Sequence, residues 1–179
     1  MANARDAIPI DPVPRLERAR ADRVTVTRDF RCEVEALYRD EGDRLWRAVF
    51  AYARSTGITD DAVAETFAQL LRRGTEVRNP RAWVWRTAFR VAAGELQRQR
   101  RDVNEVVDIS YEPPADALDV VNALHELSEN QRASVVLHDY AGYRAAEVAT
   151  MINSTEAAVR VHLMRGRRRL RNLLADELH

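Results

Sequence analysis

The sequence contains no lysine, so all 28 of its basic residues are arginine. Arginine carries a planar fork that suits phosphates and guanine edges, although a GC-rich genome would produce the same bias. The single cysteine, Cys32, excludes a disulfide framework and a cysteine-based zinc site. The four histidines show no metal-ligand spacing, and the sequence has neither a Ser/His/Asp set nor a phosphate-binding loop. We therefore expect no enzymatic activity, no metal and no cofactor.

Long hydrophobic runs are also missing from the sequence. The longest purely apolar run, Ala48–Ala53, is far too short to span a membrane. The N-terminus lacks the apolar core of a signal peptide. We therefore expect a cytoplasmic protein that does not insert into a membrane.

The formal net charge is zero, but the charges are unevenly distributed along the chain. Residues 30–101 carry 14 Arg and 10 acids, a balance of +4, and residues 128–179 carry 8 Arg and 6 acids, a balance of +2. Residues 102–127 carry 7 acids and no basic residue, a balance of −7. Two basic blocks on either side of an acidic strip favour nucleic-acid binding in spite of the neutral total.

Helical periodicity dominates the sequence, and no strand pattern is found in it. We predict an all-α fold of two small helical domains joined by an acidic flexible linker, the C-terminal domain being a helix-turn-helix. The predicted segments are a flexible extension at 1–29, in which residues 15–23 are a candidate short helix, a first domain at 30–101, a linker at 102–117 and a second domain at 118–179.

Local signals predict where several helices begin and end. Thr59 is expected to cap a helix that ends near Gly74. Asn79-Pro80 should begin the next helix, with asparagine as N-cap and proline in the first turn. Ser128 and Gln131 have the spacing of a capping box at the start of a later helix.

Residues 143–171 have the pattern of a helix-turn-helix: a short helix, a turn through Asn153 and a longer basic helix capped by Thr155. Residues 156–171 carry 6 Arg and 1 Glu, with an apolar stripe on the opposite face. A solvated surface helix would carry the same charge, but turn, cap and charge together favour contact with the DNA major groove. The candidate DNA-contacting residues are Thr155, Glu156, Ala157, Arg160, His162, Arg165, Arg167 and Arg171.

Residues 78–101 hold 7 Arg and 1 Glu interleaved with Trp83, Trp85 and Phe89. Arginines that follow a backbone and rings that stack on bases suit single-stranded nucleic acid, although each ring taken alone fits a helical core better. Residues 60–67 place three acids in the first turns of a helix, where the helix dipole alone would favour them. Their spacing therefore leaves a binding role and a purely structural role open.

These motifs resemble those of the extracytoplasmic-function sigma factors of bacterial RNA polymerase. Residues 61–67 read D-A-V-A-E-T-F and resemble D-L-V-Q-E-T-F in the family. Residues 79–90 read N-P-R-A-W-V-W-R-T-A-F-R and resemble N-P-R-A-W-L-Y-R-I-A-R-N. Residues 127–132 read L-S-E-N-Q-R and resemble L-P-E-R-Q-R, while residues 158–167 read A-V-R-V-H-L-M-R-G-R and resemble T-V-K-S-R-L-x-R-A-R. The resemblance covers most of the chain.

The resemblance implies a non-enzymatic initiation factor that binds core RNA polymerase and recognises the −10 and −35 promoter elements. It implies contacts with the clamp helices of the largest subunit, with the flap of the second-largest subunit and with promoter DNA. The family usually has an anti-sigma factor, which adds a candidate partner. The alternative is a helix-turn-helix regulator that binds DNA alone, but such a protein would leave residues 60–101 unexplained.

The resemblance also assigns residues to each contact. The residues implied in core-polymerase binding are Asp60, Asp61, Val63, Glu65 and Phe67. The residues implied in −10 binding are Arg78, Asn79, Trp83, Arg86 and Arg90. The eight candidate residues of the final helix are implied in −35 binding.

Overall fold

A computed structural model describes residues 15–101 and 114–176 of the chain. Most of these residues are helical, and no strand occurs within these two ranges, so the all-α prediction is confirmed. In chain order the helices are α1 (Arg15–Ala53), α2 (Thr56–Arg73), the 3-10 helix η1 (Gly74–Glu76), α3 (Pro80–Gln99), α4 (Ala115–His125), α5 (Glu129–Val135), the π-helical turn η2 (Val136–Tyr140), α6 (Ala145–Met151) and α7 (Glu156–Asp176). None of the described helices combines the length and apolarity needed to cross a membrane.

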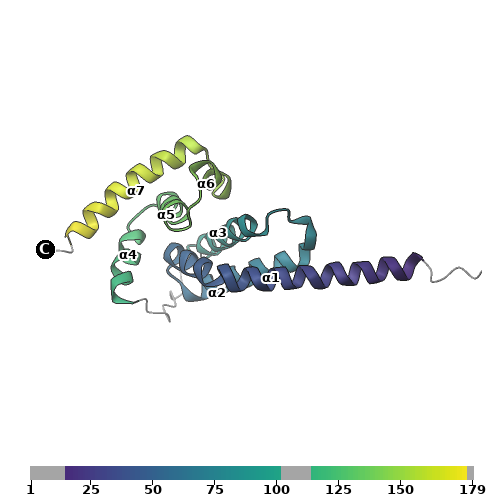
Figure 1. The fold of residues 1–179 in the computed structure, drawn as a ribbon. Helices are drawn as coiled ribbons and strands as arrows, with labels where there is room; N and C mark the ends of the chain where they lie inside the picture. Colours follow the sequence, from purple (N-terminus) through teal and green to yellow (C-terminus); the bar gives the residue numbers. More distant parts are fainter. Residues whose placement is uncertain (1–14, 102–113, 177–179) are drawn as a thin grey trace, which may run out of the picture.

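The helices fall into two groups that touch each other (Figure 1). In the N-terminal group, α2 and α3 pack together and against α1; in the C-terminal group, α4, α5 and α6 pack against α7. The groups meet where α1 contacts α4, α5 and η2, and where α3 contacts α6. The N-terminal part of α1 extends beyond both groups (Figure 1).

The core of the N-terminal group contains a buried carboxylate among large apolar side chains. Trp85 is almost fully buried, and its indole Nε1 donates a hydrogen bond of 3.1 Å to Glu41. The same carboxylate pairs with Arg81 at 2.6 Å. Because Glu41 has both a donor and a cation, the charge is compensated where it is buried.

The core of the C-terminal group depends on the predicted inward stripe of α7. Val159 and Leu163 are buried, and Gly166 continues the stripe at the point where α7 crosses α5. A Cβ atom at Gly166 would lie only 3.0 Å from Cγ2 of Val135. The glycine therefore lets the two helices approach more closely than a larger residue would.

Three predicted helix-end features are confirmed. The side chain of Asn79 accepts a hydrogen bond of 3.1 Å from the amide of Ala82. Thr155 Oγ1 accepts one of 3.2 Å from the amide of Ala158. Asn153 has a φ of 53°, the left-handed geometry expected for the turn of the helix-turn-helix.

The predicted N-cap at Thr59 was wrong. Helix α2 begins at Thr56, and its N-cap is Ser55, four residues before the predicted cap; the Ser55 side chain accepts a hydrogen bond of 3.3 Å from the amide of Ile58. Thr59 is fully buried inside the helix, and its hydroxyl donates to the carbonyl of Ser55 at 2.7 Å. The break between α1 and α2 lies at Arg54, which has a φ of 52°.

Part of the predicted extension is helical, and the helix is much longer than the candidate at 15–23. Helix α1 already begins at Arg15, so residues 15–29 are helical. Residues 1–14 lie outside the described ranges. Residues 102–113 of the predicted linker also lie outside them, and α4 begins at Ala115, inside the linker's predicted bounds.

The capping box predicted at the start of α5 does not form. Ser128 is the N-cap residue, but its side chain makes no capping hydrogen bond. The Cβ of Gln131 lies 3.6 Å from the Cβ position of Gly166, so this glutamine faces α7. Gln131 therefore packs against α7, and no capping hydrogen bond forms at Ser128.

Candidate functional site

The exposed acids of α2 form the first candidate surface: Asp60, Asp61 and Glu65. Glu65 Oε1 accepts hydrogen bonds from Gln69 at 2.9 Å and from Arg72 at 2.7 Å. These bonds, the one from Gln69 first, lower the pKa of Glu65. Among the described residues, Asp61 makes no hydrogen bond or ion pair, so its carboxylate is open to a cation of another molecule.

The two apolar residues predicted beside these acids lie in different surroundings. Val63 and Phe67 are both buried, at 5% and 7% exposed, but Phe67 also lines a groove of about 720 Å³ between α1 and α2. Phe67 packs edge to face against Tyr38, with ring centroids 4.9 Å apart. Tyr38 and Leu71 also line the groove and are 55% and 46% exposed. A partner in this groove would contact mainly the exposed Tyr38 and Leu71, because little of Phe67 and of Val63 is accessible.

The sequence did not predict this groove. Tyr38 belongs to α1 and meets Phe67 of α2 only in the folded chain. Exposure of Tyr38 and Leu71 leaves an apolar surface next to the acids. A surface of this kind, with acidic and apolar parts, suits a partner that presents basic and apolar side chains.

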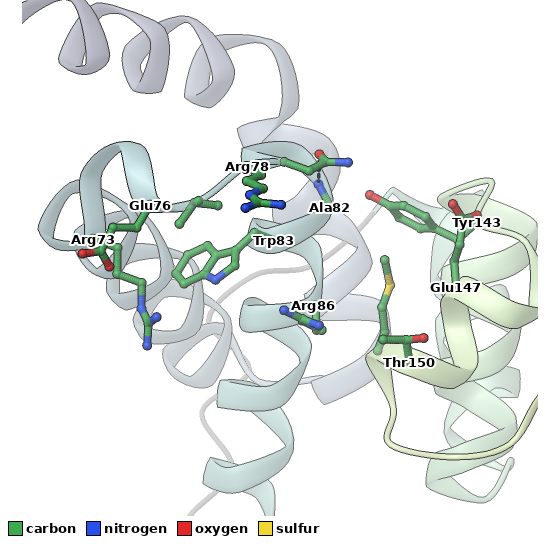
Figure 2. Close-up of a pocket in the computed structure, with 12 residues that line it drawn as sticks. Arg73, Glu76, Arg78, Ala82, Trp83, Arg86, Tyr143, Glu147 and Thr150 are labelled. Carbon is green, nitrogen blue, oxygen red and sulfur yellow. Dashed lines mark hydrogen bonds between the residues drawn. The ribbon is translucent and has the colours of Figure 1, made fainter. Parts of the chain in front are cut away.

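Four of the five residues predicted to bind the −10 element line one cavity of about 570 Å³: Arg78, Asn79, Trp83 and Arg86 (Figure 2). Arg73, which the sequence did not indicate, also lines it, and its guanidinium lies 5.9 Å from the centre of the Trp83 ring. Arg90 is exposed one turn beyond Arg86 and is not part of the lining. The α2–α3 side of the cavity therefore brings three cations, Arg73, Arg78 and Arg86, beside the half-buried ring of Trp83.

The opposite wall of this cavity comes from the C-terminal group: Tyr143, Glu147, Thr150 and Met151 (Figure 2). Tyr143 packs edge to face against Trp85 of α3, with ring centroids 5.8 Å apart, which places α6 beside α3. Hydrogen bonds from Arg144 lower the pKa of Glu147, so its carboxylate carries a negative charge at the cavity. Trp85 and Phe89 are buried and belong to the core instead.

The residues predicted to bind the −35 element lie on α7 or at its N-cap: Thr155, Glu156, Ala157, Arg160, His162, Arg165, Arg167 and Arg171. All are exposed except His162, which is half-buried. Arg160 pairs with Glu156 at 2.5 Å within the helix. Arg167 pairs with Asp139 of η2 at 2.5 Å, and this hydrogen bond raises the pKa of Arg167. Arg171 makes no ion pair with any described residue.

One arginine from each group of helices donates hydrogen bonds to backbone carbonyls at the C-terminal end of a helix in the other group. Arg132 of α5 is buried and donates to the carbonyl of Tyr52, near the end of α1, at 2.8 Å. Arg44 of α1 donates to the carbonyls of Tyr140 and Ala141, at the end of η2, at 2.9 and 3.1 Å. Carbonyls at a helix C-terminus lack partners inside the helix and attract cations, so these contacts fasten the groups together.

Comparison with known proteins relates the sequence to one family. Residues 117–170 match the family model of sigma-70, region 4. The chain is 28% identical over 158 residues to the ECF RNA polymerase sigma factor SigL of Mycobacterium tuberculosis, across 80% of this chain and 89% of the relative. It is 29% identical over 150 residues to the ECF RNA polymerase sigma factor SigM of the same species, across 78% and 76% of the two chains.

Solved structures share the fold. The sigma factor RpoE, in complex with the anti-sigma factor NepR from Bartonella quintana, aligns with a TM-score of 0.70 at 19% identity, over 82% of this chain and 97% of that one. CnrH, in complex with the cytosolic domain of CnrY, aligns with a TM-score of 0.65 at 22% identity, over 86% and 94%. The chain is similar to the extracytoplasmic-function sigma factors over most of its length, and residues 117–170 match region 4 of the sigma-70 family. Its function is promoter-specific initiation of transcription through RNA polymerase.

Proposed function

We propose that the chain binds core polymerase through the acidic face of α2 and the groove beside it. Asp61 and Glu65 supply negative charge, and Phe67 with Tyr38 supplies apolar contact next to that charge. Clamp helices of the largest subunit that present basic and apolar side chains would fit both features. The C-terminal group would contact the flap of the second-largest subunit.

The cavity at the start of α3 would hold an unpaired base of the −10 element. Trp83 offers a ring for stacking, while Arg78 and Arg86 offer charge for the flanking phosphates. Because Tyr143 and Glu147 form the opposite wall, α6 must move away before a strand can enter fully. Arg90 would contact the strand where it continues beyond the cavity.

Helix α7 would enter the major groove of the −35 element. Its N-terminal end, capped by Thr155, would face a phosphate, because helix N-termini favour anions. Arg160 lies close to that end and would reach base edges, while Arg171 lies three turns further on and would meet phosphate. Arg167 would do the same after leaving Asp139.

The observation that carries this proposal is the presence of three different surfaces on one chain: the acids of α2, the arginine–tryptophan cavity and the basic face of α7. A regulator that binds DNA alone would need only the last of them. The test is run-off transcription on genomic promoter fragments with added core polymerase. We expect the chain to co-elute with core polymerase and to direct defined starts. Equally strong and selective DNA binding without polymerase, and no co-elution, would favour the stand-alone regulator.

We further propose an anti-sigma factor as a partner, because the structurally similar RpoE was solved in complex with one. Affinity purification of the chain from its native cells should recover such a protein. The purified partner should abolish run-off transcription when it is added in equal amount, and it should have no effect on core polymerase carrying another sigma factor.

A further inference from the structure

The outer face of α7 exposes two apolar side chains that the fold does not use. Val161 is 40% exposed and Met164 is 63% exposed, whereas Val159 and Leu163 on the opposite face are buried. Ala157, one turn before Val161, is exposed as well. The three form a short apolar strip on the side of the helix that points away from the protein.

Exposed arginines border this strip on both sides. Arg160 and Arg165 flank it near the start of the helix, and Arg168 follows one turn after Met164. An apolar strip within a border of guanidinium groups matches a surface that is anionic at its edges and apolar at its centre. The major groove has this chemistry wherever thymine is present, since phosphates form its walls and the C5-methyl group of thymine projects into it.

The position of the strip along α7 fits base contact. Val161 and Met164 lie within the first three turns, and a recognition helix uses its N-terminal residues to contact base edges. Three residues advance a helix by about 4.5 Å, close to the roughly 3.4 Å that separates successive bases on one strand. The two side chains are therefore spaced for thymines at neighbouring or nearly neighbouring steps.

We propose that Val161 and Met164 read the C5-methyl groups of two nearby thymines in the −35 element. This inference rests on the proposed −35 role of α7 and adds the base that it selects. In the resembling motif a serine stands at the position of Val161, and serine reads bases by hydrogen bonding. Valine has only methyl groups to offer, so this chain selects for a methyl at that base.

The test removes the methyl groups from the DNA. The −35 sequence is first selected from a random library with polymerase that carries the full chain, and each thymine is then replaced by deoxyuridine. Replacement at two thymines should weaken promoter binding by about fourfold each, the effect of losing one methyl contact. Replacement at any other thymine should have no effect.

Variants assign each methyl group to its side chain. Val161→Ser should lose the discrimination between thymine and deoxyuridine at one position, and Met164→Gln should lose it at the other. Arg168→Ala is the matched control on the same face, and it should weaken binding to the thymine and deoxyuridine promoters equally. Equal binding of thymine and deoxyuridine at every −35 position, or a selected element without thymine, would overturn the inference and leave −35 recognition intact. No sequence selection at −35 at all would overturn the proposed role of α7 together with it.

Discussion

The guanidinium of Arg132 donates a hydrogen bond of 2.8 Å to the carbonyl of Tyr52, which lies 80 residues earlier in the chain. The side chain of Arg132 also lies 5.8 Å from the centre of the Tyr52 ring. Both residues are buried where α5 meets the end of α1. This contact joins the two groups of helices. As a result α6, in the C-terminal group, forms one wall of the cavity that Trp83 and Arg86 of the N-terminal group line.

Arg132→Met should loosen this junction while keeping most of the side-chain volume. We expect a loss of about 2 kcal/mol in unfolding free energy, because a charged hydrogen bond to a buried carbonyl is removed. Single-stranded −10 DNA should bind the variant more tightly than the wild type without polymerase, since α6 is then held less firmly. Urea unfolding and fluorescence anisotropy measure the two effects.

Arg100→Met is the matched control for this prediction. Arg100 also pairs across the two groups, with Glu129 at 2.5 Å, but its side chain is exposed. Glu129 is half-buried, but solvent around the exposed Arg100 screens the pair, which should contribute about 1 kcal/mol; the change should therefore have a smaller effect than Arg132→Met on both measurements. Equal behaviour of the two variants would contradict the role of Arg132.

His125 should make stability depend on pH. Burial first, and then the charge of Arg132, lower the pKa of His125 to about 3. In the unfolded chain this histidine takes up a proton near pH 6.5. The stability that neutral, buried His125 contributes to the fold is therefore fully present above pH 6.5 and is lost as the pH falls toward 3. Between pH 7 and pH 5 the loss should be about 1–2 kcal/mol, with allowance for partial exposure. His125→Gln should flatten the dependence measured by urea unfolding, and an unchanged pH slope in this variant would refute the assignment.

Asp61→Arg should weaken binding to core polymerase. It places a cation opposite the basic side chains proposed for the clamp helices, and like charges across an interface cost several kcal/mol. The folded monomer should hardly change, because Asp61 is exposed. Asp119→Arg, at an exposed position on α4, is the matched control. Undiminished co-elution of the Asp61 variant with core polymerase would exclude this surface.

Trp83→Ala and Arg86→Ala should impair the opening of promoter DNA. Loss of a stacking ring typically costs about 1–3 kcal/mol per base, and the loss should appear in open-complex formation rather than in binding to closed duplex. Arg90→Ala should have a smaller effect than Arg86→Ala, because Arg90 lies outside the cavity. Permanganate footprinting of melted DNA measures these effects, and equal losses in both steps would argue against the cavity.

Arg160 and Arg171 should differ in their effects on duplex binding. Arg160→Ala should cost about 1–3 kcal/mol on the preferred −35 sequence and relax selection at one position. Arg171→Ala should weaken binding to all sequences alike. It should also lower the slope of log binding constant against log salt concentration by about one. Footprinting over a −35 library at two salt concentrations distinguishes the two effects. If Arg160→Ala leaves affinity and selectivity intact, α7 does not read the DNA as proposed.

The sequence by itself determined the helices whose signals are local. The inward stripe of Val159 and Leu163, the caps at Asn79 and Thr155 and the turn at Asn153 follow from residues a few positions apart. Such features depend on helical period and side-chain hydrogen bonding within one turn. They can therefore be predicted without knowledge of the rest of the chain.

Tertiary structure decided the features that join distant residues. Arg132 meets Tyr52 across 80 residues, and Tyr143 and Glu147 complete a cavity that begins at Arg73. Even the local choice of Ser55 over Thr59 as N-cap accompanies the burial of Thr59 in the core. Helical period fixes which face of a helix is apolar, but it does not fix which other helix covers that face. That pairing depends on how all the buried surfaces fit together, and so it appears only in the folded chain.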